Sequence, residues 1–221
     1  MKKEMTVGFL TAERSFGAKF DALCDCDAAV FIIREWSRIN VKSELDGKSD
    51  VFIKMGEVSR KVKGVCFFSA LTDTYGALRR SAIAFRGGKL CAIADALSYR
   101  EKGFSPSFGV KSVSAGGYRF GIVVGDDILD QDVLKALSVT ENDAIINLSP
   151  DIFEFDKEKL VSTLAYIYGM PIATVGSDKK VIASGSGGTL YSGKDDLYKC
   201  VLPIGKKFTE KYFKVKSQEI L

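Results

Sequence analysis

Short runs of apolar residues recur along the whole chain and predict β-strands. The run Ala28–Ile33 (AAVFII) is apolar at every position, which is typical of a strand buried on both faces. Two further runs, 81–86 and 89–94, are separated by Gly87-Gly88, a spacing that predicts a hairpin. The other strands that this pattern predicts are 5–12, 65–71, 120–124, 143–148, 171–175, 180–183, 189–191 and 197–204.

Apolar residues at helical spacing predict helices between some of these strands. In the segment 49–63 they are Val51, Phe52, Met55, Val58 and Val62. In the segment 157–168 they are Leu160, Leu164 and Ile167, and a shorter helix is expected over 131–137. Hairpins and helical crossovers both occur, so the pattern predicts an α/β fold with mixed sheets. No linker interrupts it, and we expect one domain over 1–205 with a lysine-rich C-terminal extension over 206–221.

Composition and charge exclude several classes of function. The hydrophobic fraction of 46% and the charged fraction of 27% are ordinary for a globular protein. The net charge of +4 is spread along the chain without a basic stripe, so we expect no nucleic-acid partner. The apolar run 7–10 is too short for a signal peptide, and nothing approaches the ~18 apolar residues of a membrane span.

Histidine is absent, and this restricts the possible chemistry. It excludes Ser-His-Asp and Cys-His mechanisms and removes the commonest transition-metal ligand. Of the five cysteines only Cys24 and Cys26 are close in sequence, and Cys-x-Cys alone is a weak metal signal. We therefore expect no metal and no cofactor, and reduced thiols in the cytoplasm. The glycine-rich stretch 184–189 lacks a phosphate-binding pattern and predicts a hairpin turn.

An ordered set of segments carries a family resemblance. MTVGFLTA (5–12), AAVFIIRE (28–35), RRSAIAFRGGKL (79–90), YREKGFSPSFG (99–109), GYRFGIVVGDD (117–127), GMPIATVGS (169–177) and VIASGSGGTLYSGKD (181–195) follow one another along the chain. Over residues 5–203 this order resembles the nitrilase, or carbon-nitrogen hydrolase, superfamily. The resemblance implies a four-layer α-β-β-α sandwich, a homodimer, and an activity on nitriles or amides.

The same resemblance implies a Glu-Lys-Cys triad, and this chain departs from it. The family's thiolate attacks the nitrile or amide carbon, the glutamate shuttles protons and the lysine stabilises the oxyanion. The nucleophile position falls on Gly125, and the lysine position falls on Asp95 or Ala96. Glu35 matches the general base, although Arg34 stands where the family has proline. The resemblance therefore implies a degenerate triad and a non-catalytic small-molecule-binding or regulatory protein, with an amide-like ligand.

An alternative is a carbon-nitrogen hydrolase that works with substituted residues. Ser149 ends the strand 143–148, which in this architecture faces the same cleft as Gly125, and it could act with Glu35. Asp95 could pair with Arg34 or Arg100 inside such a pocket.

Each of these residues also has an ordinary structural interpretation. A glycine at a strand end is typical of a bulge or of a close backbone approach. Asp126 and Asp127 either cap the helix that follows or line the pocket. The cysteines at positions 66, 91 and 200 lie within apolar strands, which favours core packing.

Overall fold

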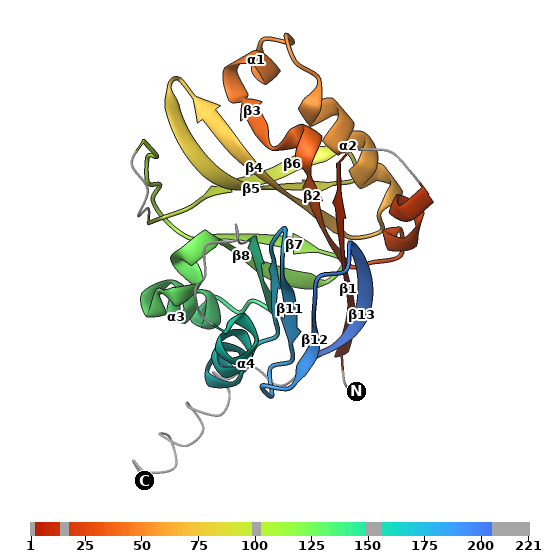
Figure 1. The fold of residues 1–221 in the computed structure, drawn as a ribbon, viewed down its shortest axis with the longest axis vertical. Helices are drawn as coiled ribbons and strands as arrows, with labels where there is room; N and C mark the ends of the chain where they lie inside the picture. The colour runs from red at the N-terminus through yellow and green to blue at the C-terminus, as the bar shows by residue number, and fades with distance from the viewer. Residues whose placement is uncertain (1–2, 14–17, 99–102, 149–155, 205–221) are drawn as a thin grey trace.

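The protein is described by a computed structural model, which covers residues 3–13, 18–98, 103–148 and 156–204. Two β-sheets lie face to face, and helices cover their outer surfaces (Figure 1). The predicted C-terminal extension and Ser149 lie outside the described residues. No helix within the described ranges is long and apolar enough to cross a membrane.

The first sheet has the strand order β13-β1-β2-β4-β5-β6, with β3 paired beside β4. The three strands β1, β2 and β4 run parallel, and β13, β5 and β6 are antiparallel to their neighbours. The bounds of these strands are β1 Lys3–Ala12, β2 Ala28–Ile33, β3 Arg38–Asn40, β4 Val65–Thr74, β5 Ala77–Arg86, β6 Lys89–Asp95 and β13 Leu197–Ile204.

The second sheet has the strand order β12-β11-β10-β9-β8-β7. Its central strands β8, β9 and β10 run parallel, so their carboxyl ends reach the same edge. The bounds of these strands are β7 Lys111–Ala115, β8 Tyr118–Val124, β9 Ala144–Leu148, β10 Ile172–Val175, β11 Lys180–Ala183 and β12 Thr189–Gly193.

Helices complete four layers. α1 (Val41–Leu45) and α2 (Val51–Lys61) belong to the side of the first sheet, and α3 (Gln131–Val139) and α4 (Lys157–Tyr168) to the side of the second. Figure 1 shows α2 on one side of the molecule and α3 with α4 on the other. Three short 3-10 helices, η1 (Ala18–Leu23), η2 (Arg34–Trp36) and η3 (Gly125–Leu129), follow or precede strands.

Alternation along the strands divides the apolar side chains among three cores. One core fills the space between the two sheets, where Phe67 and Phe120 meet edge to face with ring centroids 5.9 Å apart. A second core lies between the first sheet and α2, and a third between the second sheet and the pair α3 and α4. The predicted four-layer α-β-β-α sandwich with mixed sheets is therefore confirmed.

The predicted hairpin at residues 81–94 is confirmed. β5 and β6 pair antiparallel across Gly87 and Gly88, whose φ angles are 56° and 87°. Two consecutive left-handed residues are what a tight turn between twisted strands needs, and glycine adopts them without a steric penalty.

Three details differ from the sequence expectations. The strand β7 was not predicted, because its sequence KSVSA lacks an apolar run. α4 buries Val161 and Ala165; of the predicted face, Leu164 packs against the same core, whereas Ile167 is 49% exposed. Small side chains let this helix lie close to β10 and β11. Cys91 is exposed, because β6 is an edge strand, and it does not pack in the core.

Candidate functional site

A pocket lies where the parallel strands of both sheets end. The final residues of four strands line it, namely Ala12, Ile33, Val124 and Leu148, and it encloses about 580 Å³. This volume is in the range of sites that hold small molecules. In open α/β sheets, ligands bind at the carboxyl ends of the parallel strands, so this cleft is the candidate binding site.

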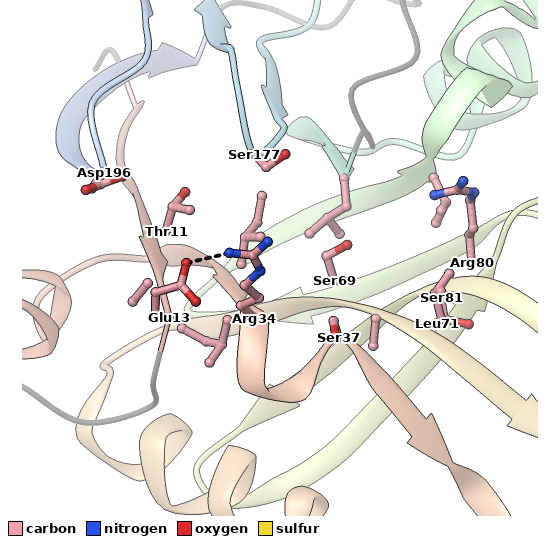
Figure 2. Close-up of a pocket in the computed structure, with 16 residues that line it drawn as sticks. Thr11, Glu13, Arg34, Ser37, Ser69, Leu71, Arg80, Ser81, Ser177 and Asp196 are labelled. Atoms are coloured by element: carbon pink, nitrogen blue, oxygen red, sulfur yellow. Dashed lines mark hydrogen bonds and ion pairs between the residues drawn. The ribbon is translucent and has the colours of Figure 1, made fainter.

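Polar and apolar side chains share the lining. The hydroxyl-bearing residues of the lining are Thr11, Ser37, Ser69, Ser81 and Ser177. Four apolar side chains form what we call the apolar floor, and they are Ile32, Leu71, Val124 and Leu148. The charged residues of the lining are Glu13, Arg34, Arg80 and Asp196 (Figure 2).

Thr11 brings a buried hydroxyl group to this cleft. Its strand neighbour Phe9 faces the core between the sheets, and alternation places Thr11 on the same face. The Oγ1 atom of Thr11 is buried and has no hydrogen-bond partner within the described ranges. A buried hydroxyl without a partner destabilises the folded protein.

Two arginines enter the pocket from different strands of the first sheet. Arg34 follows β2, and its Nη1 atom lies 2.9 Å from Oε1 of Glu13. Arg80 belongs to β5 and stacks over the ring of Phe104 at 5.1 Å. Ala82 and Ala84 of the same strand face the core between the sheets, so alternation directs Arg80 toward the cleft.

Lys180 is a fully buried lysine next to the pocket. Its ammonium group donates to the backbone oxygen of Ser177 at 3.4 Å and lies 5.7 Å from the ring centroid of Phe9. The sequence pattern places Lys180 only at the start of a strand, because one lysine before an apolar run carries no signal of burial.

Gly125 lies at the turn between β8 and η3. It is buried, its φ angle is 61°, and the preceding residue Val124 lines the pocket. A left-handed residue on a sharp strand-to-helix turn is the conformation in which α/β enzymes can present a nucleophile. It is also a conformation in which glycine avoids a steric cost that other residues meet.

Asp127 fixes this turn from inside the protein. It is 3% exposed and accepts hydrogen bonds from Leu97 N at 2.7 Å, Ser98 N at 2.9 Å and Ser98 Oγ at 2.8 Å. Burial raises the pKa of the Asp127 carboxyl, and these hydrogen bonds oppose the rise. Asp126 is half-buried in η3. Neither residue caps α3, whose N-cap is Asp130.

Asp95 lies on the other face of the first sheet. It ends β6, and Ile93 of that strand packs in the outer core, so alternation directs Asp95 away from the space between the sheets. Its carboxylate accepts a hydrogen bond from Ser81 Oγ at 2.5 Å and lies 3.7 Å from Nη1 of Arg79. The expected pairing with Arg34 is replaced by this contact with Arg79, and Arg100 lies outside the described residues.

Glu35 does not join this pocket. It is exposed in η2, and the described lining includes its neighbour Arg34 but not Glu35. Its backbone N–H donates to the backbone oxygen of Glu13 at 3.1 Å. The pocket lining thus includes Val124, the residue before Gly125, whereas Gly125, Glu35 and Asp95 are not among the described lining residues.

The cysteines are free thiols away from the pocket. All five lie among the described residues, and none of them lines the pocket. Burial raises the pKa of Cys26 to about 12 and that of Cys200 to about 11, and it also raises the pKa of Cys66. A thiol with a raised pKa holds little thiolate at neutral pH and is a poor nucleophile.

Compared by sequence, the chain matches no family model and no curated protein. Compared by structure, it resembles a carbon-nitrogen hydrolase from Helicobacter pylori G27, with a TM-score of 0.72 and 12% identity over 98% of this chain and 93% of that chain. A mutant of the Nesterenkonia AN1 amidase from the nitrilase superfamily gives a TM-score of 0.71 and 11% identity over 98% of this chain and 97% of that chain.

A third likeness is to the glutamine-dependent NAD+ synthetase from Acinetobacter baumannii. It has a TM-score of 0.65 and 18% identity, over 90% of this chain and 45% of that chain, so this chain spans less than half of that protein. At these identities the comparisons establish the fold. The chain has the α-β-β-α sandwich found in nitrilase-superfamily amidases and carbon-nitrogen hydrolases.

Proposed function

We propose that this chain is a non-catalytic small-molecule-binding or regulatory protein built on the carbon-nitrogen hydrolase fold. Its ligand occupies the pocket at the carboxyl ends of the parallel strands, and an amide-like molecule is the first candidate. The observation that carries this proposal is the absence of all five cysteines from the described pocket lining. A Nesterenkonia amidase with the same fold has an active-site cysteine that acrylamide modifies.

The turn at Gly125 supports the same proposal. The chain keeps a left-handed strand-to-helix turn beside the pocket, but glycine supplies no atom that could attack a carbonyl or nitrile carbon. At Asp95, the position matched to the family's lysine, a carboxylate contacts Ser81 and Arg79. A carboxylate cannot stabilise an oxyanion.

The hydrolase alternative has less support within the described residues. Glu35 is exposed and lies outside the described lining, so a general base at that position has no contact with a molecule in the pocket. Ser149 lies outside the described residues, and its role in this alternative stays a prediction.

A turnover assay tests the proposal. The protein is incubated with butyramide and butyronitrile, ammonia release is measured, and intact-mass spectrometry looks for an acyl adduct. We expect the wild type to release no ammonia above a buffer control and to form no adduct. Gly125→Cys and Gly125→Ala are run beside it, because both carry the same backbone strain and only the first carries a thiol. Turnover or an adduct in the wild type would overturn the proposal.

We further propose a homodimer in the cytoplasm. Three exposed apolar residues of the α3 and α4 layer support self-association, namely Val139, Tyr166 and Ile167. Light scattering after size exclusion should give twice the chain mass, and Tyr166→Glu should return the monomer. All five cysteines are free, which fits a reducing compartment.

A further inference from the structure

Two arginines and two carboxylates, those of Glu13 and Asp196, line the pocket, so the choice between an acid and an amide depends on where the arginines lie and not on a net charge. The guanidinium groups of Arg34 and Arg80 lie on opposite sides of the Ser69 hydroxyl in Figure 2, and all three residues line the same pocket. Guanidinium groups make their strongest hydrogen bonds with ionised acceptors, and paired arginines are common where a carboxylate is recognised. A neutral amide gains less from the same donors.

The ion pair between Arg34 and Glu13 does not prevent this arrangement. The two side chains are 78% and 74% exposed, and an ion pair that solvent reaches so freely is weak. Each guanidinium group has five N–H donors, so Arg34 can contact a bound anion while it still touches Glu13. The guanidinium group of Arg80, which also stacks over the ring of Phe104, likewise has five N–H donors.

The remaining lining suits a short hydrocarbon. The apolar floor comes from β2, β4, β8 and β9 and lines the same pocket as the two arginines. Val124 and Leu148 belong to the apolar core between the sheets, so burying a few methylene groups against them is favourable.

We propose that the pocket binds a short-chain carboxylic acid as its anion, with the carboxylate between Arg34 and Arg80 above Ser69. The hydrocarbon chain lies on the apolar floor. This inference rests on the proposed binding function and names its ligand class: the ionised acid, in preference to the neutral amide of the same shape.

Butyrate and butyramide form a matched pair for the test, and a Nesterenkonia amidase with this fold has been seen in complex with butyramide. Isothermal titration of the full chain at neutral pH gives both dissociation constants. Because a hydrogen bond to a charged group is stronger than one to a neutral group, we expect butyrate to bind about tenfold tighter or more. Raising the salt concentration should weaken the binding of butyrate and leave the binding of butyramide unchanged.

Three arginine variants show whether the preference comes from the pocket. Arg80→Gln and Arg34→Gln should each weaken butyrate binding about tenfold, since each removes a charged donor. Arg38→Gln is the control, because Arg38 is exposed on β3 and is not among the lining residues. Thermal unfolding of each variant confirms that its fold is intact.

Several outcomes would overturn the inference. They are equal or tighter binding of butyramide, no binding of butyrate, an equal effect of Arg38→Gln, and displacement of butyrate by inorganic phosphate at similar concentration. Binding of butyramide without turnover would leave the proposed binding function standing. Release of ammonia from butyramide would instead overturn the proposed function, whichever ligand binds more tightly.

Discussion

Replacing Asp127 by alanine removes the carboxylate that ties residues 97 and 98 to the start of η3. Three hydrogen bonds of 2.7 to 2.9 Å are lost. A hydrogen bond to a charged group contributes about 1.5–3 kcal/mol, and water can replace part of this at the exposed Ser98. We therefore expect Asp127→Ala to lower the free energy of unfolding by about 2–4 kcal/mol.

Replacing Asp127 by asparagine removes the negative charge and keeps the shape of the side chain. Its amide oxygen can still accept from Ser98, but its NH2 group would face the N–H of Leu97, so one hydrogen bond is lost. Asp127→Asn should lower the free energy of unfolding by about 1–3 kcal/mol, which is less than Asp127→Ala. Urea denaturation followed by fluorescence of Trp36, the single tryptophan and 1% exposed, gives these values.

The pH dependence has a definite sign. Burial raises the pKa of Asp127 above its ordinary value of 3.8, so the folded protein holds this proton more tightly than the unfolded chain. The stability that this adds is complete below the unfolded-state pKa and is lost as pH rises through the folded-state pKa. The advantage of the wild type over Asp127→Asn should therefore shrink as pH rises from 3.8 through the higher pKa of the folded state.

Asp132 is exposed, so Asp132→Asn is the control and should change the free energy of unfolding by about 0.5 kcal/mol or less. If the wild type's advantage over Asp127→Asn grew with pH, or if alanine and asparagine had equal effects, the account of Asp127 would be wrong.

Three more outcomes follow from the structure. Gly125→Ala forces a φ angle of 61° on a residue with a Cβ and should lower the free energy of unfolding by about 1–2 kcal/mol. An unchanged midpoint of urea denaturation would show that this strain is absent. Cys91 is exposed and should react with a thiol reagent as soon as the two are mixed. Cys26, whose pKa burial raises to about 12, should react only on unfolding, and equal reaction rates of the two thiols would refute this. Gly64→Ala would place its Cβ 1.9 Å from the backbone oxygen of Asp27, so no folded protein should accumulate; a normal circular dichroism spectrum would refute the clash.

The sequence predicts most of the fold, because hydrophobic patterning is local. AAVFII becomes β2, and the hairpin at Gly87-Gly88 follows from two residues that accept left-handed angles. The local pattern does not predict an element whose formation depends on tertiary contacts. β7 forms because β8 supplies its hydrogen-bond partners, although KSVSA has little strand signal of its own.

The candidate site is predicted less well than the fold. Gly125 was predicted at the cleft from its place at a strand end; it follows Val124, which lines the pocket, but is not itself among the described lining residues. Arg80 and Ser69 were missed as site residues, because they come from separate strands of the first sheet and meet Val124 only when the second sheet packs on it. Side-chain alternation could have found Arg80, since it shares a face with Ala82.

The pairing of β13 with β1 has a consequence for synthesis and folding. Leu10 pairs with Leu197 and Lys3 with Ile204, so the first strand of the chain meets its outer neighbour only after nearly two hundred residues have been made. Until then one edge of β1 has open backbone donors and acceptors, which is a hazard for aggregation. Such distant contacts also slow folding, because the loop must close before the contact stabilises anything. A chain cut between β12 and β13 should therefore aggregate through β1 even though its pocket strands are all present.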